Sequence, residues 1–315
     1  MELIFASARQ YWQRDGVSIK KYPIIFIGNI YSREKRSRQT ECFLVIRKPI
    51  LILTWRSSMP ELPEVETLSR QLQKKICGCV ILTSKVYDDK LNGMRNLQGR
   101  RILDVERRGK TIAIHLDDGN SILIHLRMTG RLLLQSSSVR PKHGRWRIAM
   151  KEGNIFLVDP RRFATVKVEK TKQEKIENDL LTGFDQDIFL ENQARRKVNV
   201  KVLLMDPKAV AGIGNIYACE ILHRTGISPL RQAANLSVKE WKTVFSHAKR
   251  ILKKGIEKRG TSISDWRDLY GCKGENQNEL KAYGREGKCC LMCGGTICRI
   301  KQGGRSTFYC PDCQQ

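Results

Sequence analysis

The spacing of apolar residues predicts a helix soon after residue 60. Between residues 63 and 76, apolar side chains recur every three or four positions, two glutamates lie near the start, and Gly78 follows the last apolar position. Acidic residues suit the first turn of a helix and glycine suits its end. We therefore expect a helix of about four turns here.

From residue 79 to about 170, short apolar runs alternate with turn-forming residues. The runs are "VILTSKVY", "RILDVERR", "TIAIHLDDGNSILIHL", "RLLLQ", "RWRIAM" and "IFLVD". The "DDGN" between two of these stretches is typical of a β-hairpin. Several short strands at this spacing indicate a β-sandwich or a barrel.

After "DLLTGFDQDI" the apolar spacing becomes helical again. The segments "VKVLLMD", "NIYACEILHRTG" and "VKEWKTVFSHAKRILKKGIEKRG" carry apolar residues at helical intervals, and no repeat period is visible. The expected fold class is therefore a multi-domain α+β protein. It would consist of an N-terminal helix with a β-sandwich, a helical domain and a C-terminal hairpin, preceded by a leader without a clear motif.

Four of the eleven cysteines form two CxxC pairs near the C-terminus. They are Cys290, Cys293, Cys310 and Cys313. The interval between the pairs holds two strand-like stretches joined by "KQGG", which predicts a β-hairpin. Two such pairs can surround one tetrahedral Zn²⁺, and four thiolates leave no position for water, so we expect one structural zinc rather than chance spacing. We expect Cys289 and Cys298 to be non-ligands.

The charge balance indicates the class of partner. The chain has 58 Lys and Arg residues against 32 Asp and Glu residues, a net charge of +26 at pH 7. Such a field attracts phosphate polyanions, so nucleic acid is the first partner to consider. The apolar runs "YPIIFIGNIY" and "PILILTW" are too short to span a bilayer. With no recognisable export signal, we expect a cytoplasmic location and no membrane partner.

Several turns carry residues with two possible interpretations. The glycines of "AGIGNIYACEIL" suit either phosphate binding at a helix N-terminus or a tight turn between packed helices. In "DPRRFATV" and "HLRMTGRL", the phenylalanine and Met128 suit either insertion into a base stack or burial in the core. The hairpin tip from Lys301 to Arg305 suits either phosphate contact or a solvated turn. His115 and His125 alternate with apolar residues, as structural histidines do.

Taken together, these stretches resemble formamidopyrimidine-DNA glycosylase, the bacterial base-excision family that removes 8-oxoguanine and ring-opened purines. The matching pieces run in order from Met59 to Cys313. They are "MPELPEVET", "RRGK", "HLRMTG", "DPRRF", "AGIGNIYACE", "AYGREG" and the hairpin ending "RSTFYCPDCQ". The related endonuclease VIII branch typically has glycine where Leu62 stands, so "PELPE" favours the branch that acts on purine lesions.

The resemblance implies covalent catalysis at the start of the matched region. In the family the initiator methionine is removed, and the exposed proline nitrogen attacks C1′ of the damaged nucleotide; Pro60 has that position here. A secondary amine can displace the base and then form an iminium that makes strand cleavage by elimination possible. Glu61 matches the family's acid/base carboxylate, and Glu64 matches a second carboxylate that supports the site.

Other matched positions imply contacts with DNA. Lys110, Asn215 and Arg305 match residues that grip the phosphates beside the lesion. Arg305 is also assigned to the elimination step, and we include Lys110 and Arg305 among the catalytic residues. Lys201 matches a lysine implicated in recognising the damaged purine.

Three further positions match the residues that fill the gap left when the nucleotide is flipped out. They are Met128, Arg161 and Phe163, with Arg161 facing the orphaned cytosine. Flipping costs a few kcal/mol, and filling the gap offsets part of that cost.

The sequence departs from the family's usual pattern at several positions. Arg127 and Thr129 stand where the family usually has glycine and serine, and Ala164 stands where glycine is usual. The loop that covers the flipped base often carries an aromatic residue, which is absent from "GCKGENQNELKAYG". The sequence therefore predicts no ranking of lesions.

The position of Pro60 within the chain separates the competing hypotheses. Inside a chain, a proline nitrogen is a tertiary amide whose lone pair is delocalised, so it cannot be the nucleophile. We therefore expect the functional polypeptide to begin at Met59, or the leader to be cleaved. If the leader is retained, the alternative is a catalytically silent protein that binds damaged DNA. An oxidised-pyrimidine glycosylase of the endonuclease VIII branch is the other alternative.

The expected organisation has five parts. They are a leader of unknown structure at 1–58, a catalytic β-sandwich domain at 59–185, a helical DNA-binding domain with a helix-two-turn-helix motif at 186–262, a lesion-covering loop and linker at 263–285, and a zinc finger at 286–315. The expected partner is double-stranded DNA containing oxidised purines or abasic sites, and we expect the protein to be a monomer.

Overall fold

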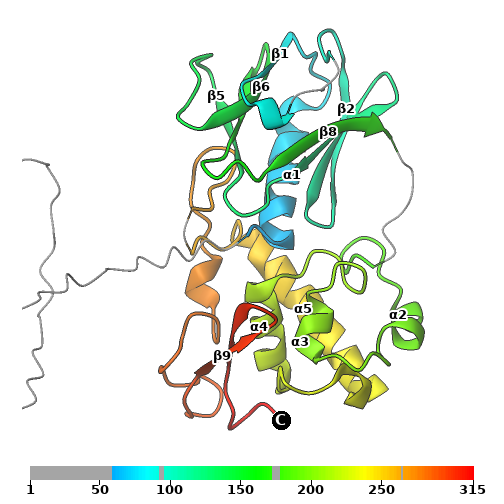
Figure 1. The fold of residues 1–315 in the computed structure, drawn as a ribbon, viewed down its shortest axis with the longest axis vertical. Coiled ribbons are helices and arrows are strands. Elements are labelled where there is room, and N and C mark those ends of the chain that lie inside the picture. The colour runs from blue at the N-terminus through cyan, green and yellow to red at the C-terminus, as the bar shows by residue number, and fades with distance from the viewer. Residues whose placement is uncertain (1–58, 92–95, 172–177, 264) are drawn as a thin grey trace, which may run out of the picture. The chain divides into compact units, whose positions relative to one another are not determined.

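A computed structural model describes residues 59–91, 96–171, 178–263 and 265–315 (Figure 1). The expected leader at 1–58 lies outside the described residues.

The predicted β-sandwich is confirmed by two four-stranded antiparallel sheets (Figure 1). The first sheet has the order β1 (Thr83–Val86), β6 (Gly144–Met150), β7 (Gly153–Val158) and β5 (Arg131–Gln135). The second has the order β2 (Ile102–Arg108), β3 (Thr111–Leu116), β4 (Asn120–His125) and β8 (Thr165–Lys170). Apolar side chains of both sheets belong to one buried core.

Strand β8 is absent from the predicted runs. Its sequence "TVKVEK" carries only two apolar residues, Val166 and Val168, which pair with Ile124 and Ile122 of β4. As the edge strand of its sheet, β8 leaves most of its remaining side chains in solvent. A strand with so few apolar positions gives a weak signal in a sequence.

Helix α1 (Leu62–Ile76) joins two hydrophobic cores. Val65, Leu68, Leu72 and Ile76 are buried against the β-sandwich, as the apolar spacing predicted. Leu62, in the first turn, belongs instead to the core of the helical domain. The backbone N–H of Glu61 donates to the Glu64 carboxylate at 2.8 Å, so the N-terminus of the helix is capped by its own third residue.

The helical domain consists of four α-helices in the described residues. They are α2 (Gln186–Asn192), α3 (Val200–Leu204), α4 (Asn215–Thr225) and α5 (Val238–Glu257). Phe189 packs edge-on against Trp241 and Phe245, which fixes α2 on α5. Short 3-10 helices lie at Asp89–Leu91 (η1), Ala233–Asn235 (η2) and Asn276–Glu279 (η3).

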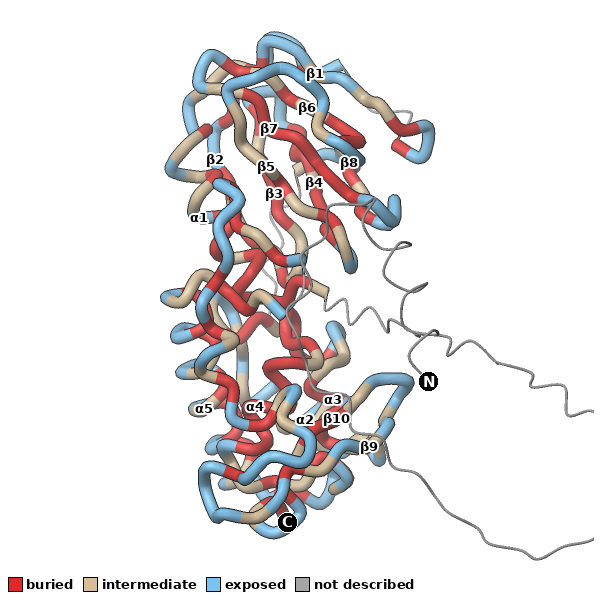
Figure 2. Tube along the Cα trace, turned by 90° about the vertical axis from the view of Figure 1, so that its left-hand side faces the viewer, coloured by how far each residue is buried: buried red, intermediate tan, exposed pale blue. Residues whose placement is uncertain are grey.

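The C-terminal hairpin has the predicted form. Strands β9 (Cys298–Gln302) and β10 (Arg305–Tyr309) pair in antiparallel fashion around Gly303 and Gly304, both at positive φ. Phe308 packs with Cys219 of α4 in a small third core. Figure 2 shows buried residues running through both sheets, the helices and the base of this hairpin. The N-terminus of α4 contacts both this hairpin, through Asn215 and Ser306, and the residue before α1, through Ile216 and Glu61.

Candidate active site and zinc centre

The carboxylate of Glu61 caps the N-terminus of α4. Its oxygens accept backbone N–H groups of Gly214 at 2.8 Å, Ile216 at 2.9 Å and Tyr217 at 3.3 Å. A helix N-terminus favours an anion, because its first N–H groups have no partners within the helix. Burial nevertheless raises the pKa of Glu61, although the Lys110 ammonium and these N–H donors act in the opposite direction. Glu61 therefore combines a fixed orientation with a strengthened hold on a proton.

Gly214 is required for this approach of carboxylate and helix. A Cβ at this position would lie 2.3 Å from Cδ of Glu61, inside van der Waals contact. The glycine immediately before α4 thus serves close packing against a carboxylate, which is a third use besides the two that the sequence suggested. Pro60, which directly precedes Glu61 in the chain, is also buried.

Glu64 lies one turn further along α1 and is also buried. Its carboxylate accepts the Glu61 N–H at 2.8 Å, the Tyr217 hydroxyl at 2.9 Å and the Thr261 N–H at 2.6 Å. Burial, together with the nearby Glu61 carboxylate, raises the pKa of Glu64 to about 7. Glu64 can therefore exchange a proton near neutral pH, beside a second carboxyl group, Glu61, whose pKa is also raised.

Lys110 supplies positive charge beside these carboxylates. It lies in the two-residue turn between β2 and β3, and burial lowers its pKa while the Glu61 carboxylate opposes that shift. Arg305 also lowers the pKa of Lys110 by charge repulsion, which places the hairpin arginine in the same electrostatic environment. The charges of Arg305, Glu61 and Glu64 thus all act on the Lys110 ammonium.

A buried ion pair holds the end of β2, just before the turn with Lys110, against the segment that precedes α2. Arg107 pairs with Asp179 and also donates to Glu66 of α1 at 2.8 Å. Sequence reasoning missed both acidic partners, because a single charged residue far along the chain carries no local signal. Breaking such a buried pair is strongly destabilising, since the remaining charge loses its partner.

Lys201 lies in the interior rather than on an open surface. Its side chain is fully buried, and its ammonium donates to Oδ1 of Asn215 at 2.5 Å and to Oγ1 of Thr307 at 2.8 Å. Asn215 in turn donates to the carbonyl of Ser306 at 2.9 Å. Lys201 therefore joins α3, α4 and β10, and it orients Asn215 at the first turn of α4. Arg305, at the start of β10, is exposed.

Met128, Arg161 and Phe163 come from two adjacent loops. Met128 is 36% exposed and Phe163 is 46% exposed. The Arg161 guanidinium lies 4.8 Å from the centre of the Phe163 ring. The exposure of Met128 and Phe163 excludes the alternative that they are buried core residues.

Asp159 ties these two loops together. Its carboxylate accepts the Thr129 hydroxyl and the backbone N–H groups of Phe163 and Ala164, the latter two at 2.7 Å. A Cβ at Gly130 would meet the carbonyl of Leu126 at 2.4 Å and Cβ of Ala164 at 2.8 Å. Thr129 thus supplies a bridging hydroxyl, and Ala164 fits because residue 130 has no side chain.

The departure at Arg127 has a conformational consequence. Arg127 has φ = +57°, in the left-handed region that glycine adopts without strain. Its backbone N–H donates to Nδ1 of His125 at 3.1 Å, and burial and the Arg127 charge lower the pKa of His125 to about 4.

The other histidine singled out in the sequence, His115, forms hydrogen bonds with Ser121 at 2.7 Å and with Glu106 at 3.0 Å. Both histidines therefore have hydrogen-bond partners, as expected of structural residues.

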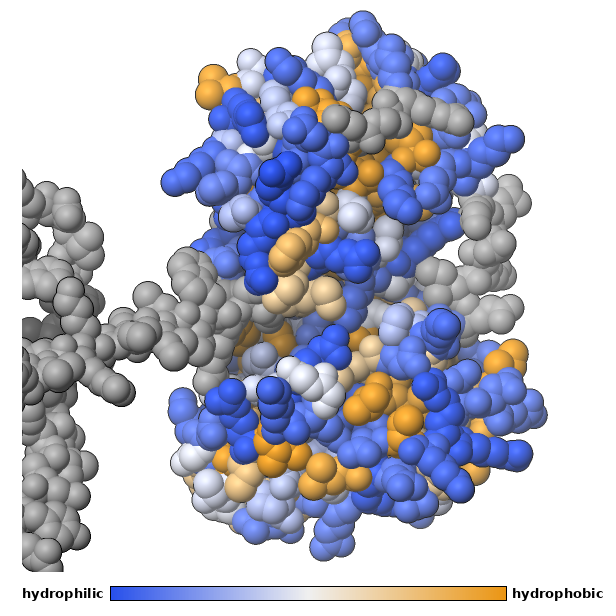
Figure 3. Space-filling model, in the orientation of Figure 1, coloured by the Kyte–Doolittle hydropathy of each residue, from blue (hydrophilic) through white to orange (hydrophobic). Residues whose placement is uncertain are grey.

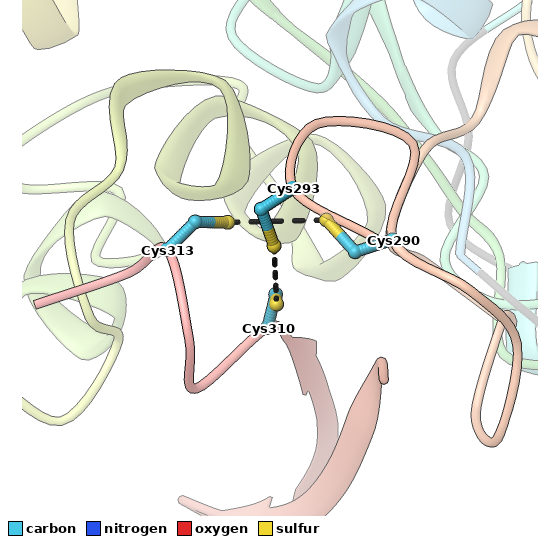
Figure 4. A group of neighbouring side chains, drawn as sticks. All are labelled: Cys290, Cys293, Cys310 and Cys313. Carbon is cyan, nitrogen blue, oxygen red and sulfur yellow. Dashed lines mark hydrogen bonds between the residues drawn. The ribbon is translucent and has the colours of Figure 1, made fainter. Parts of the chain in front are cut away.

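The four cysteines of the two CxxC pairs converge at the base of the hairpin, from the loop before β9 and the segment after β10 (Figure 4). All four sulfur atoms lie within 4.8 Å of one another, with Cys290 and Cys313 at 3.8 Å and Cys293 and Cys310 at 3.5 Å. A tetrahedral ion with Zn–S bonds of about 2.3 Å requires S···S distances of roughly 3.8 Å. The sulfur geometry therefore fits one structural Zn²⁺, which these four thiolates would hold.

Cys289 and Cys298 lie outside this group, as expected. Their thiols donate instead to the carbonyls of Gly294 at 3.4 Å and Thr296 at 3.8 Å. His223 of α4, which sequence reasoning missed, places Nε2 3.2 Å from Sγ of Cys290. An N–H donated to a ligand sulfur orients that ligand and tunes its bond to the metal.

The face shown in Figure 3 is mainly hydrophilic, with separate apolar patches. Among the described helices, none has the length and apolar character needed to cross a membrane.

Three family models match successive parts of the chain. Residues 59–166 match the formamidopyrimidine-DNA glycosylase N-terminal domain, residues 177–266 match the formamidopyrimidine-DNA glycosylase H2TH domain, and residues 287–315 match the zinc finger found in FPG and IleRS. These matches support the expected β-sandwich, helical domain and zinc hairpin in the same order.

Curated relatives and solved structures agree with these matches. The formamidopyrimidine-DNA glycosylase of Carboxydothermus hydrogenoformans is 39% identical over 267 residues, which covers 82% of this chain and 100% of the relative. That of Desulfitobacterium hafniense is 37% identical over 274 residues, covering 81% and 100%.

Two solved structures of the Lactococcus lactis enzyme are similar in fold. One is a complex of a mutant with DNA containing Fapy-dG, at TM-score 0.75 and 32% identity, covering 81% of this chain and 100% of that one. The other is a complex with DNA containing an abasic site, at the same score and identity, covering 81% and 99%. With identity of this level across the whole length of its relatives, the chain belongs to the formamidopyrimidine-DNA glycosylase family.

Proposed function

We propose that this protein is a base-excision DNA glycosylase and abasic-site lyase that removes oxidised purines from duplex DNA. The observation that carries the proposal is the buried pair Glu61 and Glu64, held beside Pro60 at the N-terminus of α4. The relatives named for this activity, and the Fapy-dG and abasic-site complexes of the Lactococcus lactis enzyme, support the same reaction.

The nitrogen of Pro60 would be the nucleophile. It forms a bond to C1′ of the damaged nucleotide as the glycosidic bond breaks, and the proton that the nitrogen loses balances the one that the leaving base takes up. The nitrogen lone pair then closes an iminium while the C1′–O4′ bond opens and O4′ takes a proton. Loss of a C2′ proton expels the 3′ phosphate, and a second elimination would release the 5′ phosphate. Because an amide nitrogen lacks an available lone pair, the reaction requires that nothing be attached to Pro60.

Glu61 would transfer the protons of these steps. Its raised pKa strengthens its hold on a proton, which it would deliver to O4′ of the opening sugar. The three N–H donors of α4 stabilise the carboxylate that remains. Glu64 would support Glu61 by bonding its backbone and by adding negative charge that favours an iminium.

Basic and polar groups around the carboxylates would bind the DNA backbone. Lys110, Asn215 and Arg305 are proposed to contact phosphates beside the lesion, with Arg305 assisting elimination. The contact between Lys201 and Asn215 would hold the asparagine in place, so that Lys201 acts on the DNA partly through Asn215.

The two loops joined by Asp159 would enter the duplex. Met128 and Phe163 offer exposed apolar side chains that can replace a flipped nucleotide in the stack, and Arg161 would face the orphaned base. We assign the substrate branch to oxidised purines because Leu62 stands where the endonuclease VIII branch has glycine. Since the substrate would be chromosomal DNA, the proposed location is the bacterial cytoplasm.

The test compares a chain beginning at Pro60, after methionine removal, with the 315-residue chain. On a duplex with 8-oxoguanine opposite cytosine, the shorter chain should excise the base and form a covalent complex when borohydride reduces the iminium. The full chain should do neither. Its binding of the duplex without trapping would correspond to the silent damage-binding alternative.

Two outcomes would contradict the proposal. One is efficient trapping of the full chain with the peptide bond before Pro60 still intact by mass spectrometry. The other is preference of the shorter chain for thymine glycol over 8-oxoguanine, which would favour the oxidised-pyrimidine alternative.

A further inference from the structure

A buried polar cluster behind Glu64 has no role in the reaction as described. The Tyr217 hydroxyl, which donates to Glu64, lies 3.0 Å from the hydroxyl of Thr261. The side-chain amide of Asn276 donates to both hydroxyls, at 3.3 Å to Tyr217 and 2.8 Å to Thr261. All four side chains are at least nine-tenths buried, so their polar atoms depend on one another for partners.

The donors and acceptors in this cluster have a defined direction. Each hydroxyl has one proton to donate. Because an ionised carboxylate only accepts hydrogen bonds, the proton of the Tyr217 hydroxyl is directed to Glu64, and Tyr217 can only accept from Asn276. Since the Tyr217 proton is already donated to Glu64, the hydroxyl of Thr261 is the donor in its contact with Tyr217, and it accepts from Asn276. Asn276 therefore supplies the donors at one end of a chain of hydrogen bonds that ends on a carboxylate.

Asn276 is itself held firmly by the segment around it. Its backbone N–H donates to the carbonyl of Gly260 at 3.1 Å, and the preceding Glu275 N–H donates to the carbonyl of Lys258 at 2.7 Å. A Cβ at Gly274 would lie 2.1 Å from the carbonyl oxygen of Gly260, so the two backbones are in direct contact. The start of η3 and the segment that follows α5 thus form one unit, which fixes the side-chain amide of Asn276.

We propose that Asn276 is a positioning residue of the reaction, acting through the Tyr217 hydroxyl to hold Glu64 as an oriented carboxylate beside Glu61. This inference rests on the proposed function. Asn276 would touch neither substrate nor the reacting atoms. Its effect reaches the site through two hydrogen bonds, from its amide to Tyr217 and from Tyr217 to Glu64.

The predicted consequence is a change in pH dependence. The titratable groups that interact with Glu64 are Glu61 on the same helix, Tyr217 on α4 and Lys110 after β2. Removing the amide frees the Tyr217 hydroxyl to turn toward Thr261, and Glu64 then loses a donor that favours its ionised form. The pH at which Glu64 ionises should rise, and the acidic limb of the rate profile should rise with it.

The test uses three variants of the chain that begins at Pro60. Asn276→Leu removes both amide donors at similar volume, and Asn276→Asp replaces donors with acceptors that compete for the tyrosine proton. Asn278→Leu is the matched control, because Asn278 lies in the same short helix but is exposed. Single-turnover excision of 8-oxoguanine is measured from pH 5.5 to 9, and zinc content and thermal unfolding verify folding.

We expect Asn276→Leu to shift the acidic limb upward by about half to one pH unit, the effect of one hydrogen bond. Asn276→Asp should shift it further, and Asn278→Leu should leave it unchanged. In a Tyr217→Phe background, Asn276→Leu should produce little additional shift, because the tyrosine hydroxyl carries the effect. A uniform loss of rate at every pH, or fully additive effects of the two substitutions, would overturn the inference.

A second measurement separates this inference from the proposed function. Titration of the Glu64 carboxyl by ¹³C NMR needs no substrate. A midpoint unchanged by Asn276→Leu refutes the role of Asn276 whatever the activity. If the midpoint moves but neither the parent chain nor Asn278→Leu excises 8-oxoguanine, the inference about Glu64 stands as a coupling and the proposed function fails.

Discussion

Gly214 donates its backbone N–H to the Glu61 carboxylate at 2.8 Å, across 153 positions of sequence. The contact orients the proposed proton donor on the N-terminus of α4, and it is possible only because residue 214 has no side chain.

Gly214→Ala should therefore displace Glu61. The new Cβ would lie 2.3 Å from Cδ of Glu61, so the carboxylate must move by about an ångström. A displacement of this size costs on the order of 100-fold in rate, which single-turnover excision measures. Gly119→Ala is the control, because nothing lies within 4 Å of its Cβ, although φ is +74°. The control should lose about 1 kcal/mol of stability and no activity.

Glu64 should make the folded protein less stable as pH rises. Its pKa is about 7 when folded against 4.5 unfolded, so the folded state binds more protons between these values. The resulting stabilisation is fully present below pH 4.5 and is lost as pH rises through 7, on the order of 3 kcal/mol in total. Urea unfolding at successive pH values measures it, and Glu64→Gln should flatten the dependence. An equally steep decline in that variant would assign the effect to other groups.

The contact of His223 with Cys290 should slow the loss of zinc. His223→Phe removes the N–H that approaches the sulfur at 3.2 Å while keeping an aromatic ring in the site. Loss of such an outer partner lowers metal affinity by roughly 10- to 100-fold, so competition with a chromogenic chelator should extract zinc faster. Cys298→Ser, which alters a thiol outside the cluster, should leave extraction unchanged. Equal rates in all three proteins would refute the role of His223.

Arg127→Gly should stabilise the protein while weakening DNA binding. Arg127 has φ = +57°, a conformation that costs about 1 kcal/mol for a residue with a side chain. Denaturant unfolding should reveal that gain, and DNA titrations at several salt concentrations should show lower affinity, because an exposed cation next to Met128 is lost.

Arg162→Gly serves as the matched comparison for this prediction. Arg162 has a similar φ of +58°, but its guanidinium pairs with the buried Asp88. That pairing lowers the pKa of Asp88, so the substitution should destabilise the protein despite relieving the backbone. A gain of stability in both variants would mean that the ion pair contributes nothing.

The exposed side chains of Met128 and Phe163 should matter for duplex substrates in particular. A double Met128→Ala, Phe163→Ala variant loses the groups proposed to fill the gap, so excision from an 8-oxoguanine duplex should fall by about 10- to 100-fold. Cleavage of a single-stranded abasic substrate should change far less, because no stacked gap has to be filled. Leu103→Ala, another exposed apolar residue, should affect neither reaction. Equal losses on both substrates would assign these residues a different role.

Much of the fold could be predicted from local sequence patterns. Helix α1, the β-sandwich, the long helix α5 and the C-terminal hairpin follow from apolar spacing and turn residues, which act over a few positions. The edge strand β8 was missed because half of its residues are exposed and its pattern holds only two apolar residues. The zinc ligands were predicted because short CxxC spacing already limits where four thiolates can lie.

By itself, the sequence determined the order of the elements, the four zinc ligands and the candidate residues of the site. Only the tertiary structure decided which groups meet: Glu64 with Thr261 across 197 positions, Lys201 with Asn215 in the interior, and Asn276 with Tyr217. The periodicity of apolar residues indicates which face of a helix or strand is buried. It does not indicate which polar group from a distant part of the chain contacts that element. Burial and proximity set the protonation of Glu61 and Glu64, and both arise only when the chain folds.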